Sequence, residues 1–163
     1  MRPWTVASGL IESDEGLLLV QNRRRNGRHD WSTPGGVIEV HEGETVLDGL
    51  TREVYEETGV TVKAWEGPVY EVEAIAQGLG WHLRVEVHRA LAYEGELRPA
   101  DPDGIVVEAR YVALDRCHEQ LATNYEFVRE PLGAWLGERW TAARRYRYRI
   151  DGASREEISV VRL

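Results

Sequence analysis

The sequence contains little that would place the chain outside the cell or in a membrane. Cys117 is the single cysteine among 163 residues, so no internal disulfide can form, as is usual in a reducing cytoplasm. The first residues lack the apolar core of a signal peptide, and no stretch approaches the roughly 18 apolar residues of a membrane span. We therefore expect a soluble, cytoplasmic protein with no membrane partner.

Positive charge and linker-like segments are also scarce. Lysine and arginine number 20 against 28 acidic residues, which gives a formal net charge of −8. This balance disfavours nucleic-acid binding, because such binding draws most of its affinity from phosphate neutralisation by basic side chains. No proline, glycine or serine tract is long enough for a linker. We therefore expect residues 1–163 to form a single domain.

Apolar and alternating segments predict a sheet that runs through most of the chain. Ser13, Asp14, Glu15 and Gly16 predict a hairpin turn between the first two strands, and a short strand should begin near Trp31. The other expected strands are Val6 to Glu12, Gly16 to Gln21, Val60 to Ala76, Trp81 to Tyr93, Ile105 to Leu114, Tyr146 to Ile150 and Ile158 to Leu163.

Two helices are expected among these strands. In the first, Thr45 can cap the N-terminus and Gly59 the C-terminus, while Leu47, Leu50 and Val54 follow the spacing of a buried stripe. The second helix should lie between about Asp115 and Arg139. We expect it to be interrupted near Pro131, because proline removes an interior helical hydrogen bond.

The segment from Arg23 to Asp30 is polar and carries an Asn-Gly pair, so we expect a loop. Its arginines have two interpretations. Arg23, Arg25 and Arg28 either form a solvated charged surface or bind the phosphates of a ligand.

Glu53, Glu56 and Glu57 are the residues in the first helix that suggest chemistry. Their i, i+3, i+4 spacing projects three carboxylates from one side of the helix. Such like charges cost an isolated helix about 0.2–0.5 kcal/mol per pair, and a divalent cation would turn this repulsion into coordination. Taken alone, most glutamate-rich helices of this kind are better interpreted as solvated surface.

The preceding segment, Trp31 to Gly36, favours the cation site. It can bring a strand into a tight turn, where Gly35 and Gly36 let backbone carbonyls approach a metal or phosphate without a Cβ clash. A strand, a glycine turn and an acidic helix together indicate a metal site.

At this point the chain resembles the Nudix (MutT-like) hydrolase family. The second half of the family signature is matched by the run Arg52-Glu53-Val54-Tyr55-Glu56-Glu57-Thr58-Gly59-Val60. Upstream, Gly43 and Glu44 match the Gly-Glu before the helix, with the usual spacing from Glu44 to Arg52. The segment between Gly36 and Glu44 is two residues longer than in the family, which we interpret as a loop extension. The signature therefore covers about residues 36–60.

The resemblance implies a fold and a set of residue roles. The fold would be α/β, a Nudix-type α/β/α sandwich with a mixed β-sheet. Arg52, Glu53 and Glu56 would be catalytic, Arg52 by orienting the carboxylates. Glu44 would support the loop and helix. The metal, Mg²⁺ or alternatively Mn²⁺, would be bound by Glu53, Glu56, Glu57 and the Gly36 carbonyl.

The general base remains open between Glu53 and an acidic residue from a distant loop. Among distant residues, Glu108, Asp101 and Asp103 are the candidates, since the turn from Asp101 to Gly104 precedes a strand.

The resemblance implies Mg²⁺-dependent hydrolysis of a phosphoanhydride bond in a nucleoside diphosphate derivative or nucleoside triphosphate. The partner would then be a nucleotide-type small molecule, and a homodimer is one alternative for the assembly. The rival interpretation is a noncatalytic Nudix-like module that binds a nucleotide as a sensor. Intact Arg52, Glu53, Glu56 and Glu57 favour the enzyme, whereas the longer loop keeps the sensor open.

Overall fold

The larger of two β-sheets is mixed and has six strands. The fold is described from a computed structural model of residues 1–163. The strand order is β10-β9-β6-β7-β1-β5, with β1 parallel to β7, β6 parallel to β9, and the remaining pairs antiparallel. The strands span β1 (Arg2–Leu10), β5 (Gly35–Val37), β6 (Thr61–Ala76), β7 (Trp81–Glu94), β9 (Arg144–Asp151) and β10 (Ser159–Arg162).

The smaller sheet has four antiparallel strands, of which β2, β4 and β8 each pair with β3. Its strands are β2 (Glu12–Ser13), β3 (Gly16–Arg23), β4 (His29–Ser32) and β8 (Val106–Val112).

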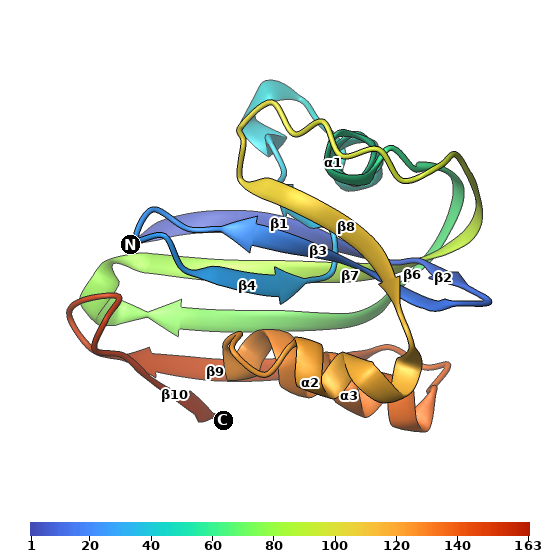
Figure 1. Ribbon diagram of the computed structural model, residues 1–163. Helices are drawn as coiled ribbons and strands as arrows, with labels where there is room; N and C mark the ends of the chain where they lie inside the picture. The colour runs from blue at the N-terminus through green and yellow to red at the C-terminus, as the bar shows by residue number, and fades with distance from the viewer.

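Helices cover the sheets from two sides. Helix α1 lies on one side, whereas α2 and α3 lie on the other (Figure 1). This layering and the mixed sheet confirm the predicted α/β/α sandwich. The helical elements are η1 (Val40–Glu42), α1 (Val46–Thr58), η2 (Gln77–Leu79), η3 (Leu114–Arg116), α2 (Cys117–Gln120) and α3 (Glu126–Glu138).

Each helix layer closes its own hydrophobic core. Beneath α1, Leu50 and Val54 pack with Ile38 and other residues in a cluster of 8 buried side chains. On the opposite side, residues of α3 pack with strand residues, including Tyr146 and Tyr148 of β9, in a cluster of 18. Since burying a large apolar side chain contributes about 1.5–3 kcal/mol, both clusters fix how the helices sit on the sheets.

The predicted first hairpin is confirmed in part. Ser13 pairs with Gly16 across the expected turn. The expected strand from Val6 to Glu12 is instead two elements that belong to different sheets. Strand β1 ends at Leu10 and pairs with β7, whereas β2 pairs with β3. At the other end of the chain, the antiparallel pairing of β9 with β10 confirms the predicted return strand.

The caps of α1 lie where they were predicted. The Thr45 side chain accepts a hydrogen bond from the Asp48 backbone N–H at 3.1 Å. At the other end, Gly59 adopts a φ of 85°, and its N–H donates to the Tyr55 carbonyl at 2.8 Å. A left-handed conformation is what glycine accommodates without steric cost.

The predicted buried stripe of α1 was wrong at one position. Leu50 and Val54 are fully buried, but Leu47 is 40% exposed. Val46 packs against the core in its place. The reason is helical phase, since Val46, Leu50 and Val54 recur every four residues, whereas Leu47 is turned about 100° from Val46.

The second helical region is interrupted earlier than predicted. Helix α2 ends at Gln120 and α3 begins at Glu126, whereas Pro131 lies buried inside α3. The interruption is stabilised by Asn124, whose side-chain amide donates to the Trp31 carbonyl of β4 at 2.8 Å. Packing of the buried proline ring offsets the single backbone hydrogen bond that is lost in α3.

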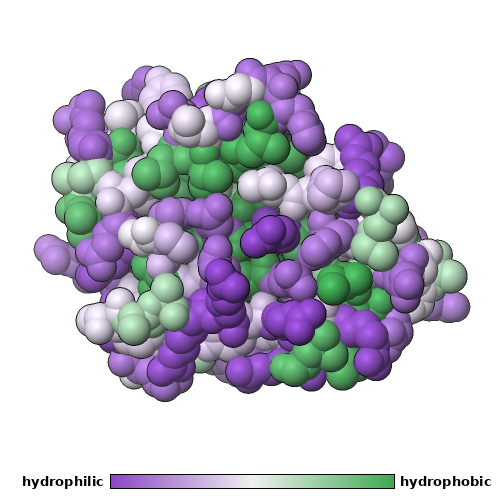
Figure 2. Space-filling view, turned by 180° about the vertical axis from the view of Figure 1, so that it is seen from behind, coloured by the Kyte–Doolittle hydropathy of each residue, from purple (hydrophilic) through white to green (hydrophobic).

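Charged side chains cover the exposed part of the large sheet. Arg145 and Arg147 of β9 form ion pairs with Glu71 and Glu73 of β6, at 3.1 and 3.3 Å respectively. On the face behind the view of Figure 1, hydrophobic patches are separated by hydrophilic side chains (Figure 2). None of the helices has the length and apolar character needed to span a membrane.

Candidate active site

The C-terminal half of α1 faces the glycines of β5. Glu57 is only 8% exposed, and its Oε1 accepts a hydrogen bond from the Gly35 N–H at 3.1 Å. A Cβ on Gly36 would lie 2.9 Å from the Glu53 carboxyl carbon, and one on Gly35 would lie 2.1 Å from the Ala7 carbonyl oxygen. Neither position has room for a side chain, so the two glycines form a cradle for the carboxylates.

Burial changes the protonation of these two carboxyl groups. Burial, aided by the neighbouring Glu53 and opposed by the Gly35 N–H, raises the pKa of Glu57 to about 9. Burial also raises the pKa of Glu53. Two adjacent carboxyl groups in a dry environment disfavour two negative charges, and a bound cation would reverse this preference.

Arg52 connects the carboxylates to the start of the helix. Its Nε donates to Glu44 Oε2 at 2.9 Å and its Nη2 to Glu44 Oε1 at 3.2 Å. The remaining nitrogen, Nη1, lies 3.3 Å from Glu53 and 3.2 Å from Glu56. The hydrogen bond with Arg52 also lowers the pKa of Glu44. The structure thus brings together four of the residues that the sequence singled out.

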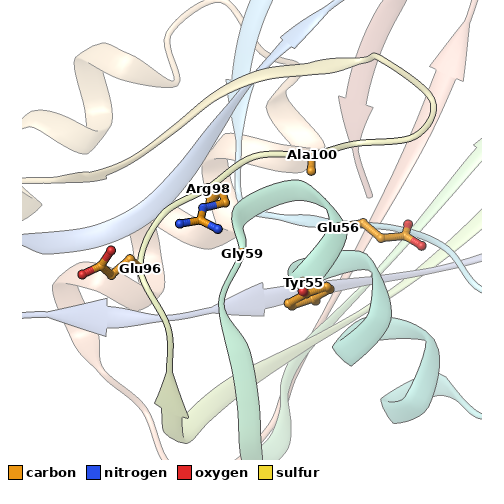
Figure 3. A pocket seen from close by; sticks show the side chains of 6 residues that line it. All are labelled: Tyr55, Glu56, Gly59, Glu96, Arg98 and Ala100. Atoms are coloured by element: carbon orange, nitrogen blue, oxygen red, sulfur yellow. The ribbon is translucent and has the colours of Figure 1, made fainter.

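Glu56 is set apart from the other two glutamates. No three acidic, histidine or cysteine side chains are grouped closely enough to hold a metal ion, although three carboxylates were expected on one side of α1. Glu53 and Glu57 are one turn apart and face β5. Glu56 shares the Arg52 ion pair with Glu53, but it also lines a cavity of about 360 Å³ on the outer side of the helix (Figure 3).

The extended loop between Gly36 and Glu44 leaves the cradle undisturbed. Its extra residues form the exposed turn η1, which ends at Gly43 with a φ of 85°. Two hydrogen bonds close this loop by bringing Glu44 next to Glu39. The Glu44 N–H donates to the Glu39 carbonyl at 3.2 Å, and Glu44 Oε1 accepts the Glu39 N–H at 3.0 Å. Gly36 therefore contacts Glu53 and Glu44 contacts Arg52 despite the insertion.

The segment from Gly95 to Asp101, here called the strap, is hydrogen-bonded to the C-terminal end of α1. The sequence analysis missed this feature. The Arg98 N–H donates to the Thr58 carbonyl at 2.7 Å, and the Ala100 N–H donates to the Glu56 carbonyl at 3.1 Å. Figure 3 shows this segment crossing the helix end. The sequence feature that could have indicated this extended segment is Pro99, which has no N–H and lies between the two donors Arg98 and Ala100.

Only one of the three distant acidic candidates approaches the glutamates. Asp101, at the end of the strap, raises the pKa of both Glu53 and Glu57. Its carboxylate accepts three backbone N–H groups, from Asp103, Ile105 and Val106 at 2.9–3.1 Å. Asp103 is exposed, and Glu108 pairs with Arg110.

In the basic loop, the arginine that forms an ion pair is Arg24, which the sequence analysis did not select. Arg23, Arg25 and Arg28 are exposed and form no ion pair. Arg24 instead makes two hydrogen bonds to Asp30, at 2.6 and 2.9 Å. Its pKa is raised by these bonds and, to a smaller extent, by the nearby Tyr125 and Glu57. The run of three consecutive arginines gave no sign of which side chain pairs with Asp30.

Comparison with known proteins agrees with this fold. The NUDIX domain family matches residues 1–136, and the chain belongs to this family. A MutT-like protein of Streptomyces ambofaciens is 42% identical over 59 residues, which are 36% of each chain. An ADP-ribose pyrophosphatase of Methanocaldococcus jannaschii is 35% identical over 63 residues, 39% of this chain and 36% of the relative. The chain thus aligns with about a third of the length of each relative.

Solved structures extend the similarity to most of the chain. A MutT NUDIX hydrolase from Burkholderia pseudomallei matches with a TM-score of 0.60 and 28% identity, over 71% of this chain and 86% of that one. The E. coli ORF135 protein matches with a TM-score of 0.69 over 87% of this chain and 96% of that one. At 18% identity, the second match concerns the fold alone.

The raised pKa of Glu57 predicts how pH affects stability without metal. Between its ordinary value of 4.5 and about 9, the folded state retains a proton that the unfolded state releases. Stability should therefore fall as pH rises through this range. Glu57→Gln keeps an acceptor for Gly35 but cannot ionise, so its melting temperature should depend less on pH. Thermal melting of both proteins in chelator between pH 5 and 9 checks this, and parallel curves would contradict it.

Proposed function

We propose that the protein hydrolyses a phosphoanhydride bond in a nucleoside diphosphate derivative or nucleoside triphosphate, with a divalent metal as cofactor. The observation that carries this proposal is the Glu53–Glu57 pair, held against the glycine cradle of β5 and bordered by Arg52. We also keep the expectation that it acts in the cytoplasm on a small-molecule substrate.

The donor groups fit a hard cation. Carboxylate and carbonyl oxygens are the ligands that Mg²⁺ and Mn²⁺ prefer. Glu53, Glu57 and the Gly36 carbonyl would hold the ion, and Glu56 would join them by turning its side chain away from Arg52. The absence of a Cβ at Gly36 keeps that space open. When bound, Mg²⁺ would neutralise phosphate oxygens and make water more acidic.

The remaining residues have roles that follow from their contacts. Arg52 holds the charges of Glu53 and Glu56 in place, and Glu44 fixes Arg52 with two hydrogen bonds. Glu53 is the best candidate for the general base, because it is half-buried beside Glu57 and its raised pKa favours proton uptake. Asp101 is a poorer base, since three N–H groups occupy its carboxylate oxygens.

Arg24 is the residue that we assign to a substrate phosphate. Asp30 takes one edge of its guanidinium, Nε and Nη2, which leaves Nη1 without a protein hydrogen-bond partner. Arg24→Met should raise KM roughly 10- to 100-fold, as expected for losing a hydrogen bond to a charged group. Arg25→Met, in the same loop but without an ion pair, is the matched control and should leave KM unchanged. Steady-state kinetics would contradict the assignment if both variants behaved alike.

The rival function, a noncatalytic nucleotide sensor, rested on the longer loop. Because that loop forms an outward turn and leaves Gly36 against Glu53 and Glu44 against Arg52, it gives no reason to expect an impaired site. The geometry therefore favours an enzyme.

Product analysis across a substrate panel tests the proposal. The proposed substrate class puts nucleoside triphosphates first in the panel, and the name of one relative adds ADP-ribose. Dinucleotide polyphosphates and nucleotide sugars follow. Each is incubated with Mg²⁺, with Mn²⁺ or with chelator. Hydrolysis that needs metal supports the enzyme. Binding without turnover across the panel would support the sensor instead.

A further inference from the structure

Tyr125, at the start of α3, presents an exposed aromatic ring on a rigid support. The residue is 43% exposed, yet its ring is stacked on Phe127, with centroids 5.3 Å apart and planes inclined by 10°. Phe127 belongs to the main core and is only 9% exposed. Stacking therefore covers one face of the Tyr125 ring and fixes its orientation.

Hydrogen bonds tie the same segment to the arginine that we assign to phosphate. The Tyr125 N–H donates to Asn124 Oδ1 at 2.7 Å, and Asn124 Nδ2 donates to the Trp31 carbonyl at 2.8 Å. Trp31 directly follows Asp30, the ion-pair partner of Arg24. Tyr125 is also near enough to Arg24 to affect the pKa of the guanidinium. The ring and the cation thus border one region.

Other aromatic side chains are less suitable for contact with a ligand. Trp31 is 9% exposed, and Trp65 donates its indole N–H to Thr51 of α1 at 2.9 Å. Trp81 packs against the main core. Tyr55 is exposed, but it lies in the cavity on the outer side of α1, away from the glycine cradle (Figure 3).

We propose that Tyr125 stacks on the nucleobase of the substrate and thereby determines which diphosphates bind well. The proposal rests on the proposed function, because it places the substrate phosphates between Arg24 and the glutamates. Every base has a π-face, so stacking selects for the presence of a base more than for its identity. The protein should then accept several bases and discriminate against diphosphates that carry none.

Kinetics of two Tyr125 variants test this role. Tyr125→Ala should raise KM for nucleotide substrates about 10-fold with little change in kcat, since stacking is made equally in the ground and transition states. Tyr125→Phe keeps the ring and should resemble the parent. For 5-phosphoribosyl diphosphate, which lacks a base, KM should be the same in all three proteins. A KM increase of similar size for this compound would show that the tyrosine acts on folding or on phosphate binding, and would overturn the proposal.

Direct binding separates this proposal from the hydrolytic one. Titration calorimetry with AMP and with ribose 5-phosphate requires no turnover, and melting curves check that Tyr125→Ala is folded. The parent and Tyr125→Phe should bind AMP more tightly than ribose 5-phosphate, and Tyr125→Ala should lose that preference. If the parent hydrolyses none of the panel, the proposed function fails while this comparison still decides the role of Tyr125. Equal AMP affinity in the parent and Tyr125→Ala, or no AMP binding by the parent, would overturn it.

Discussion

Replacing Glu53 by glutamine should lower kcat by about 10²- to 10⁴-fold on the best substrate, the range expected for removal of a general base. The fold should be retained, because glutamine has nearly the same shape and Glu53 lies beside Arg52 rather than in the apolar core. The change also removes a charge from the pair that would hold the metal. Stabilisation of the parent by Mg²⁺, measured as a rise in melting temperature, should therefore shrink in the variant.

A matched control for this variant is Glu42→Gln in the extended loop. Glu42 is an exposed glutamate of η1, so its loss changes the net charge equally without touching the cradle. Both kcat and the response to Mg²⁺ should stay at the parental values. If Glu53→Gln and Glu42→Gln had the same kcat, Glu53 would have no part in the chemistry.

Leu50→Asp should reduce the free energy of unfolding by more than about 4 kcal/mol, enough to unfold many domains of this size. Leu50 is fully buried in the cluster beneath α1, where an aspartate would find no ion-pair partner. Urea denaturation followed by circular dichroism measures the loss. Since the same helix carries Glu53 and Glu57, activity should disappear together with the fold.

Leu47→Asp is the corresponding control on the exposed side of α1. It makes the same chemical change at a residue that is 40% exposed and lies in the first turn of the helix. The unfolding free energy should change by no more than about 0.5 kcal/mol, and a negative charge near a helix N-terminus is itself favourable. If both substitutions were equally destabilising, the helix would face the sheet differently from the structure.

Local signals in the sequence were sufficient to predict the main elements. Thr45 and Gly59 predicted both ends of α1, since a capping hydroxyl and a left-handed glycine act on the residues next to them. Most strands were predicted because alternation reports a sheet with differently exposed faces. The prediction that Leu47 is buried was wrong because three apolar residues at helical spacing define the buried face of a helix only to within one adjacent residue.

Features that depend on distant segments could not be predicted in this way. Strand β5 separates the roles of the glutamates, because it contacts Glu57 and Glu53 but not Glu56. This strand comes next to α1 only after the chain has folded. Which arginine forms an ion pair depends on Asp30, and the position of the α2–α3 interruption depends on the contact between Asn124 and Trp31. These are side-chain contacts between separate elements, and no periodicity along the chain reports them.

The two C-terminal strands protect the large sheet from aggregation. Both β9 and β10 lie beyond residue 136, where the family match ends, yet β9 pairs with β6 from Tyr70 to Ile75. A chain shortened to residue 136 would expose that stretch of β6 as an open edge, a template for pairing between molecules. With both strands present, the outermost strand is the four-residue β10, which ends at Arg162. Short, charged edges of this kind are poor templates for intermolecular strand addition.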